Sequence, residues 1–404
     1  MKIVSFVEGA NPKRGGVGIF SVPIISKSLS KRGHDVRLVT GGAVNPGYEK
    51  YSLRSLGQET LPAQASQGSF GIAAFPAITR WSFSPSLIKH VKKEVQKADF
   101  IMLHSLYSYP VLSGYWLAQN NQIPYGLWLH GVLAPFQRGV GKRKKFIYDR
   151  LFARSIMNHA SILLFTAPDE KKEASDLNLP APSTIIPLGF EPSRLAGQKD
   201  EFRKKYLTGF QGDYILFLAR INAKKGLELL LSAFAQVLKQ KPEILLVIAG
   251  GDDPPEYGQK IRRMAAEMGI GKSVIFTGLL LGQDKENAFT DAALYTLPSH
   301  AENFGTSIFE AMSKGLPVVI SNTNNYAQEI ERREAGIAVP RDPNTLASEI
   351  ILLLGDPARR KIMGDNGIAL TAQFTWQRCA QSLEEVIIKV LRKEPVPPDY
   401  YGLR

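Results

Sequence analysis

Residues 299–321 of this 404-residue chain read SHAENFGTSIFEAMSKGLPVVIS, the most informative stretch of the sequence. The pattern indicates a short buried strand, Leu294–Leu297, before it, a helix over about Thr306–Lys314, and a second strand, Leu316–Ile320. Gly315 is a natural terminator for that helix. Apolar strands that alternate with helices are typical of a parallel sheet covered by helices on both faces.

The loop inside this stretch has the residues of an anion site. Gly305, just before the helix, lets the backbone approach a ligand closely. The first N–H groups of the helix, from Thr306 and Ser307, would then face an anion, with the helix dipole assisting. Glu302 and Glu310 flank the loop, and carboxylates accept hydrogen bonds from sugar hydroxyls. The stretch therefore predicts a phosphate cradle beside a sugar-binding site.

A second informative element is LARINAKKG, residues 218–226. A predicted strand ends at Arg220, and Lys225 with Gly226 opens the following helix. Ligands of open α/β sheets bind at the carboxyl ends of the strands, where both cations are expected. An arginine fork and a lysine point charge can together neutralise a leaving diphosphate.

Apolar runs continue to alternate with amphipathic stretches over nearly the whole chain. The other expected strands are Lys2–Val7, Asp35–Thr40, Phe100–His104, Tyr125–His130, Ser161–Thr166, Tyr214–Ala219, Ile244–Ala249, Ser273–Thr277 and Gly336–Val339. They form two sets, which predict an α/β protein with two doubly wound, Rossmann-like domains. Prolines and glycines in IIPLGFEPSRLAGQ, residues 185–198, predict a seam between domains 1–190 and 191–375.

Composition restricts the class of protein. The hydrophobic content of 44% is typical of a soluble globular chain, and the lone Cys379 excludes an internal disulfide and a multi-cysteine zinc site. No apolar stretch approaches the ~18 residues that cross a bilayer, and Glu8 comes too early for a signal peptide. We therefore expect a cytoplasmic protein without a membrane segment.

The net charge of +13 favours anionic partners: nucleotides, acidic lipids or nucleic acid. The densest basic cluster is formed by Lys142, Arg143, Lys144 and Lys145. A plain solvated helix face is the alternative interpretation of this cluster.

With these motifs in place, the chain resembles the retaining glycosyltransferases of family 4, also called group 1, which have the GT-B fold. The pattern E-x-FG-x4-E-A-M-x2-G-x-PVV, from Glu302 to Val319, is the family's E-x7-E motif with its surroundings. Further similarities, in the family's order, are Gly15-Gly16, KRGHDV at 31–36, His130-Gly131, IIPLGF at 185–190, R-x4-K-G at 220–226 and IAGG at 248–251. The resemblance covers roughly residues 1–380.

The resemblance implies that a nucleotide-sugar donor binds mainly to the C-terminal domain. Arg220 and Lys225 are expected to grip the donor diphosphate, assisted by the amides of Gly16, Thr306 and Ser307. Metal-dependent glycosyltransferases of another fold use an Asp-x-Asp motif, which occurs nowhere in this sequence. We therefore predict that neither a bound metal nor a cofactor is required.

The resemblance also implies which residues bind the sugar and the nucleoside of the donor. Glu310 is expected to bind the ribose hydroxyls. Glu302 is expected to bind the hydroxyls of the transferred sugar, with the backbone around Asn303, Phe304 and Gly305. Family members retain the anomeric configuration by front-face attack, so no protein nucleophile is assigned.

His130, which ends a predicted strand before a glycine, is expected beside the donor sugar. His104 ends another strand, and whether it faces a ligand or the core stays open. Asp169 and Glu170 follow a third strand and are expected to cap a helix.

The acceptor is expected on the N-terminal domain. HGVLAPF, residues 130–136, loosely resembles a segment of relatives that build bacterial surface polysaccharides, followed here by the basic cluster at 142–145. The hypothesis is a glycan or lipid-linked acceptor and peripheral contact with an anionic membrane at its inner face. The final helix, from Trp376 within 376–404, is expected to pack back on the first domain, as in relatives.

Two other functions are alternatives to a glycosyltransferase. One is a nucleotide-sugar epimerase of similar architecture, although its carboxylate pattern differs from E-x7-E. The other is a nucleic-acid-binding protein, suggested only by the basic surplus and by no motif. GGVGIFS, residues 15–21, lacks the third glycine of a dinucleotide fingerprint, which counts against a dehydrogenase. The transferred sugar is expected to be a hexose, and the donor a UDP-sugar or a GDP-sugar.

Overall fold

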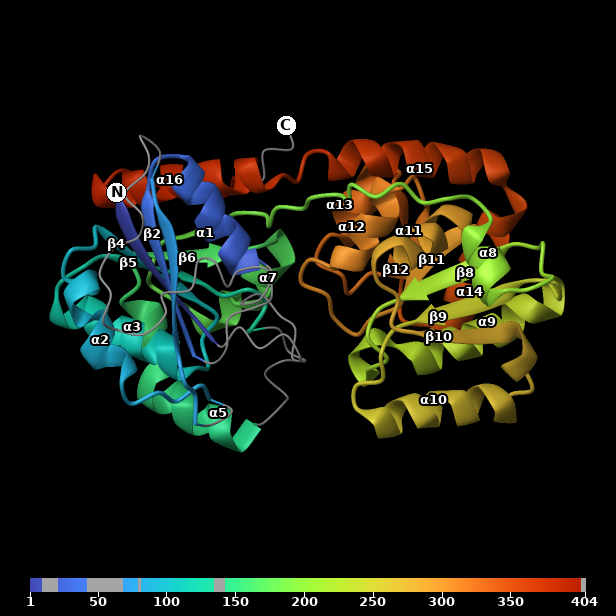
Figure 1. Cartoon of the computed structure of the whole chain (residues 1–404), viewed down its shortest axis with the longest axis horizontal. Coiled ribbons are helices and arrows are strands. Elements are labelled where there is room, and N and C mark those ends of the chain that lie inside the picture. The colour runs from blue at the N-terminus through green and yellow to red at the C-terminus, as the bar shows by residue number, and fades with distance from the viewer. Residues whose placement is uncertain (9–20, 42–67, 79–80, 134–141, 401–404) are drawn as a thin grey trace. The chain divides into compact units, whose positions relative to one another are not determined.

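A computed structural model describes residues 1–8, 21–41, 68–78, 81–133 and 142–400. Gly16 lies outside these ranges, as do the side chains of Lys142, Arg143 and Lys144. The chain forms two compact units (Figure 1). Unit 1 comprises Met1–Gly189 together with Phe374–Arg404, and unit 2 comprises Phe190–Gln373.

Unit 1 contains a seven-stranded parallel sheet with strand order β3-β2-β1-β4-β5-β6-β7. The strands are β1 (Lys2–Val7), β2 (Asp35–Gly41), β3 (Phe70–Phe75), β4 (Phe100–His104), β5 (Tyr125–Trp128), β6 (Ile162–Phe165) and β7 (Ser183–Ile185). The strand order reverses between β1 and β4. Such a switch point is where open α/β sheets bind ligands, beyond the carboxyl ends of the strands.

The helices of unit 1 cover both faces of this sheet (Figure 1). Those with described bounds are α1 (Ser21–Lys31), α2 (Leu87–Val95), α3 (Tyr109–Asn120), α5 (Lys142–Tyr148), α6 (Arg154–Asn158), α7 (Pro168–Glu173) and α16 (Trp376–Leu391), with a π-helical turn over Asp149–Ala153. Helix α3 approaches the sheet closely at Gly114, where a Cβ atom would come within 2.6 Å of Leu103 and 2.7 Å of Phe6.

Helix α16 packs against α1, although the two are more than 340 positions apart in sequence. Its Glu384 is paired with Arg32 and lies 2.8 Å from the Nε2 atom of His34. Trp376, at its start, lies on Gly189, where a Cβ atom would come within 2.5 Å of the tryptophan. Residues on both sides of unit 2 in the chain thus complete a single core in unit 1.

Unit 2 contains a six-stranded parallel sheet with strand order β10-β9-β8-β11-β12-β13. The strands are β8 (Tyr214–Leu218), β9 (Leu245–Ala249), β10 (Val274–Gly278), β11 (Leu294–Leu297), β12 (Val318–Ser321) and β13 (Gly336–Val339). The helices are α8 (Glu201–Tyr206), α9 (Leu227–Gln240), α10 (Pro255–Glu267), α11 (Gly282–Asp291), α12 (Thr306–Ser313), α13 (Ala327–Arg332), α14 (Pro343–Gly355) and α15 (Pro357–Thr371). Here the strand order reverses between β8 and β11.

The two doubly wound sheets confirm the predicted fold class, and most strands lie where the sequence predicts them. Strands β3 and β7 were not predicted. Both are edge strands, and β7 has only three residues, too few to show a hydrophobic period. The strand predicted over Tyr125–His130 ends at Trp128, because His130 and Gly131 turn with φ values of 51° and 77°.

Two helices of unit 2, α14 and α15, have an aspartate as their N-cap. The Asp342 carboxylate accepts a hydrogen bond of 2.7 Å from the N–H of Thr345, and that of Asp356 accepts one of 2.9 Å from the N–H of Arg359. Each cap is worth about 1 kcal/mol to its helix. In the part of the chain that the structure describes, no helix has the length and apolar character needed to cross a bilayer.

Candidate active site

The loop from β11 into α12 forms the first part of the candidate site in unit 2. Gly305 precedes the helix with φ 69°, and a Cβ atom there would lie 2.8 Å from Ile308 and 2.9 Å from Asn324. Only glycine fits this turn. Because the first N–H groups of a helix have no partner within it, those of Thr306 and Ser307 are directed out of the helix end.

The same helix end is tied to the switch point of the sheet. The buried Tyr295, on β11, places its hydroxyl 2.7 Å from the hydroxyl of Ser307 and donates to the carbonyl of Leu218, at the end of β8, over 3.2 Å. The predicted anion cradle is thus held beside the carboxyl ends of β8 and β11.

Glu302 and Lys225 form an ion pair beside the carboxyl ends of β8 and β11. Their side chains are only 9% and 16% exposed, so the pair is largely shielded from water. The hydroxyl of Ser299 also donates to Glu302 over 3.0 Å. The carboxylate expected to bind the sugar and the ammonium expected to bind the diphosphate therefore lie in direct contact.

Arg220 lies at the end of β8 and is paired with Asp253, from the loop after β9. This pair is more open, with side chains 59% and 46% exposed. Asn222 fixes the Asp253 backbone by donating to its carbonyl over 2.6 Å. Arg220 is therefore at the predicted edge of the sheet, and its guanidinium group already has a carboxylate partner.

Glu310 lies on α12, and its Oε1 atom accepts a hydrogen bond of 2.8 Å from the ammonium group of Lys285, on α11. Both side chains are about a quarter exposed. Like the other two pairs, this one joins a carboxylate and a cation from different elements of unit 2.

Phe304 has a structural role as well as its place in the motif. Its side chain is buried and stacks on Phe309 with a centroid distance of 4.1 Å, so only its backbone is open to a ligand. The neighbouring Asn303 accepts a hydrogen bond of 3.0 Å from the Asn325 amide. These contacts fix the loop that carries Glu302.

In unit 1, His130 and Gly131 follow β5 with left-handed backbones. The N–H of Gly131 donates to the fully buried Glu170, which also accepts 2.6 Å and 2.5 Å bonds from the N–H and hydroxyl of Thr166. Burial raises the pKa of Glu170, and these hydrogen bonds oppose the rise. The predicted cap by Asp169 or Glu170 is wrong, because the N-cap of α7 is Ala167, without a side-chain cap hydrogen bond; Glu170 instead fixes the turn that presents His130.

The ring of His130 belongs to an aromatic stack. Its centroid lies 4.9 Å from that of Trp128 and 5.3 Å from that of His104. The Nε2 atom of His130 lies 3.0 Å from the Nδ1 atom of His104, which is 1% exposed. Burial lowers the pKa of His104 to about 3, and burial together with His104 lowers that of His130 well below its usual value. Both imidazoles are therefore neutral at physiological pH.

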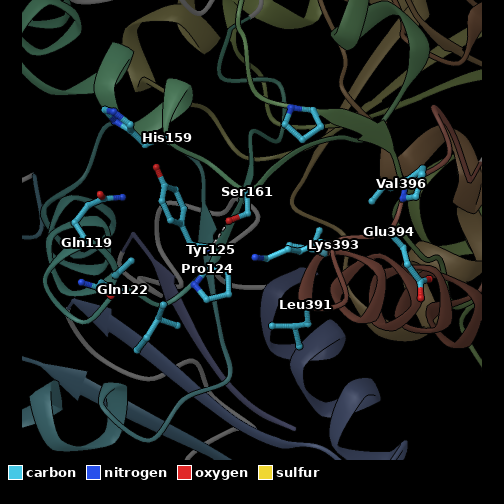
Figure 2. Close-up of a pocket in the computed structure, with 15 residues that line it drawn as sticks. Gln119, Gln122, Pro124, Tyr125, His159, Ser161, Leu391, Lys393, Glu394 and Val396 are labelled. Carbon is cyan, nitrogen blue, oxygen red and sulfur yellow. Dashed lines mark hydrogen bonds between the residues drawn. The ribbon is translucent and has the colours of Figure 1, made fainter.

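A cavity of about 660 Å³ in unit 1 is not this site (Figure 2). It is lined by Tyr125 and Ser161, at the amino ends of β5 and β6, by Val390 and Leu391 at the end of α16, and by residues 393–396 after it. Because His130 follows the carboxyl end of β5, the cavity lies at the opposite edge of the sheet. It contains none of the predicted site residues.

Sequence reasoning missed the partners of the predicted residues. Asp253, Lys285 and the link from Glu170 to Gly131 carry no motif of their own. Lys225 and Glu302 are 77 positions apart, and Lys285 and Glu310 are 25 apart. Only the order of strands in the sheet brings such residues together. A prediction of which loops share the carboxyl edge would have found them.

The chain is similar to known proteins over most of its length. Residues 198–370 match the family described as "Glycosyl transferases group 1", and residues 22–189 match the "Glycosyl transferase 4-like domain". A relative, D-inositol 3-phosphate glycosyltransferase of Corynebacterium jeikeium, is 24% identical over 412 residues, covering 95% of this chain and 92% of that protein.

Solved structures show the same fold. Sucrose-phosphate synthase of Thermosynechococcus elongatus matches with a TM-score of 0.72 at 20% identity, covering 97% of this chain and 100% of that one. HepE of Anabaena, in complex with UDP and glucose, matches with a TM-score of 0.72 at 18% identity, covering 96% and 99%.

Proposed function

The chain belongs to the group 1 glycosyltransferases and has their GT-B fold, and from this we propose a retaining, metal-independent hexosyltransferase acting on a glycan or lipid-linked acceptor. Enzymes of this family use nucleotide-sugar donors. Beyond family membership, we propose a role for each site residue, a reaction that needs no metal, and the kind of acceptor. We also propose that the enzyme acts in polysaccharide assembly.

One observation carries the proposal: the shielded pair of Lys225 and Glu302 beside the start of α12. A departing nucleoside diphosphate needs cations and N–H donors, and the transferred sugar needs a hydrogen-bond acceptor. When a donor binds, Lys225 exchanges the carboxylate for diphosphate oxygens, and Glu302 becomes free to accept sugar hydroxyls. The pair keeps both charges compensated until that exchange.

Arg220 and the N–H groups of Thr306 and Ser307 complete the stabilisation of the leaving group. A guanidinium fork and a helix N-terminus both favour bound phosphate. Their combined positive charge is the basis for proposing that no metal is needed. Catalysis then rests on charge stabilisation and on the orientation of the acceptor hydroxyl.

His130 is proposed to bind the donor sugar. The neutral imidazole offers one donor and one acceptor. Its Nδ1 atom is buried and has no hydrogen-bond partner among the described residues. No side chain is proposed as a nucleophile, in keeping with front-face attack.

We propose peripheral membrane contact through α5 and the turn that follows. After the basic cluster at 142–145, the side chains of Phe146, Ile147 and Leu151 are 67%, 59% and 61% exposed. Basic residues attract anionic headgroups, and exposed apolar side chains enter the interface. Both features on one segment favour a membrane surface over a plain solvated helix.

Flotation with phosphatidylserine vesicles tests this contact. Replacing 142–145 by glutamine, or Phe146, Ile147 and Leu151 by serine, should each reduce binding several-fold. The control replaces the equally exposed Leu352 and Ile362 of unit 2 by serine, which should leave binding unchanged. Unchanged flotation of both α5 variants would refute membrane contact.

A thermal-shift screen tests the donor site. UDP, GDP, ADP and their sugar conjugates are added with and without EDTA, beginning with UDP because HepE was crystallised with it. A rise in melting temperature with one nucleotide, unaffected by EDTA, supports the proposal. Acceptor-dependent release of the nucleotide then separates a transferase from an epimerase. If only nucleic acid stabilised the protein, the proposal would fail.

A further inference from the structure

We propose that Lys285 is a positioning residue for the nucleotide, because its ammonium group fixes the Glu310 carboxylate that accepts the ribose hydroxyls. This inference rests on the proposed function, which assigns Glu310 to the ribose. Lys285 itself belongs to no motif of the sequence.

The geometry of the pair favours this role. The Nζ atom of Lys285 lies 2.8 Å from the Oε1 atom of Glu310, and the side chains are 23% and 25% exposed. Such a half-buried pair is less screened by solvent than one on the open surface. With Oε1 engaged, Oε2 accepts no hydrogen bond from the described residues and remains available to a ligand.

Lys285 is held from its other side as well. Its Nζ atom lies 4.0 Å from Glu286, which is 2% exposed. The ammonium group of Lys314 lies 2.7 Å from the other oxygen of Glu286 and donates to the Leu195 carbonyl over 3.0 Å. Positive and negative groups therefore alternate from Glu310 to Lys314, and the series is anchored on the backbone.

This arrangement prepares Glu310 before the nucleotide arrives. A free glutamate side chain would lose rotamer freedom when it binds the ribose, which weakens binding. The ion pair with Lys285 removes much of that freedom in advance. The vicinal ribose hydroxyls can then donate to a carboxylate of fixed orientation, and a 2′-deoxyribose, which lacks one hydroxyl, makes a poorer match.

Discrimination between ribose and deoxyribose is therefore the property to measure. Isothermal titration calorimetry compares UDP with 2′-deoxy-UDP, and GDP with 2′-deoxy-GDP, on the full chain. Wild type should bind the ribonucleotide about tenfold more tightly, since a hydrogen bond to a charged group is lost in the deoxy form. Lys285→Met should reduce this ratio to about twofold, and Lys285→Arg should restore most of it.

Lys205→Met is the matched control. Lys205 pairs with Asp284, the neighbour of Lys285 in α11, over the same kind of distance, 2.7 Å, but its side chain is 59% exposed. This variant should keep the wild-type ratio. The kcat of Lys285→Met at saturating donor should stay near wild type while the donor KM rises, as expected for a group that orients a binding residue.

Two results would overturn the role of Lys285 without affecting the proposed function: Lys285→Met that leaves both affinities unchanged, or Lys285→Met that weakens ribo- and deoxyribonucleotides equally. The second result would indicate a purely structural lysine. If wild type bound no nucleoside diphosphate, the proposed function would fail and Lys285 would fail with it. The measurement on wild type therefore distinguishes the two failures.

Discussion

The candidate site of unit 2 and that of unit 1 differ in their chemistry. In unit 2, Arg220, Lys225 and Lys285 are each paired with a carboxylate. In unit 1, His130 lies in a neutral aromatic stack with His104 and Trp128. Arg220 and Lys225 can exchange their carboxylates for the phosphates of a donor, whereas Lys285 is proposed to stay paired with Glu310. A neutral stack offers shape and single hydrogen bonds.

The comparison suggests a division of labour. The charged site of unit 2 should govern affinity for the nucleotide and the stability of the departing diphosphate, and both should depend on salt. The neutral stack of unit 1 should govern the orientation of the sugar, which should depend little on salt. Substitutions can test each site separately.

The largest effect is expected at the shielded pair of unit 2. Lys225→Ala and Glu302→Ala should each lower kcat/KM about 100- to 1000-fold, the scale of losing one preorganised group at a developing charge. Initial rates of nucleotide release measure this, and circular dichroism checks the fold. The double variant Lys225→Met with Glu302→Gln keeps the shape of the pair without its charges. Near-wild-type turnover in Lys225→Ala would overturn the diphosphate assignment.

A smaller effect, of another kind, is expected in unit 1. His130→Ala should lower kcat about 10- to 100-fold, because one hydrogen bond to the reacting sugar is lost. The Kd for the free nucleoside diphosphate should not change. If that Kd rose as much as kcat fell, the separate roles given to the two sites would be wrong.

The neutral histidines also predict a dependence of stability on pH. Unfolded His104 takes up a proton near its usual pKa of 6.5, whereas in the fold burial holds the pKa at about 3. The unfolded state therefore binds more protons between these values. Above pH 6.5 this group does not change the free energy of unfolding with pH. As the pH falls from 6.5 toward 3, it lowers the free energy of unfolding by about 1.4 kcal/mol per pH unit.

Urea denaturation at pH 7.5, 6.5 and 5.5 measures this loss, with His104→Asn as the comparison. The variant should be less stable at pH 7.5 but lose less free energy of unfolding on acidification. Equal losses in both proteins would show that His104 is charged in the fold.

The smallest effect is expected at the exposed pair of unit 2. Asp253→Asn removes the carboxylate that competes with the donor for Arg220. Exposed pairs are worth about 0–1 kcal/mol, so the nucleotide should bind up to about fivefold more tightly. Calorimetry at low and high salt measures this, and the gain should shrink with salt. Weaker binding would mean that Asp253 helps to hold Arg220 in place.

The sequence predicted those parts of the fold that are local. Buried strands such as Lys2–Val7 and Leu294–Leu297 depend on adjacent residues and are confirmed. The edge strand Phe70–Phe75 was missed although FGIAAF is apolar and mostly buried, because glycine and alanine have a low propensity for strands.

The candidate site was predictable as a set of motifs but not as a set of contacts. Glu302 and Lys225 were recognised separately, and their pairing follows only from the adjacency of β8 and β11. His104 could not be assigned from sequence because a histidine that ends a strand can face a ligand or the core. Its place against His130 depends on the pairing of β4 with β5.

The position of α16 has a consequence for how the protein is made. Unit 2 is one continuous segment, whereas unit 1 is completed only by Phe374–Arg404. A ribosome synthesises the whole of unit 2 before it reaches the helix that covers α1. Unit 2 can therefore finish folding first, and the face of α1 that packs against α16 stays uncovered until α16 emerges. Unit 1 begins to be synthesised before unit 2 and is completed after it.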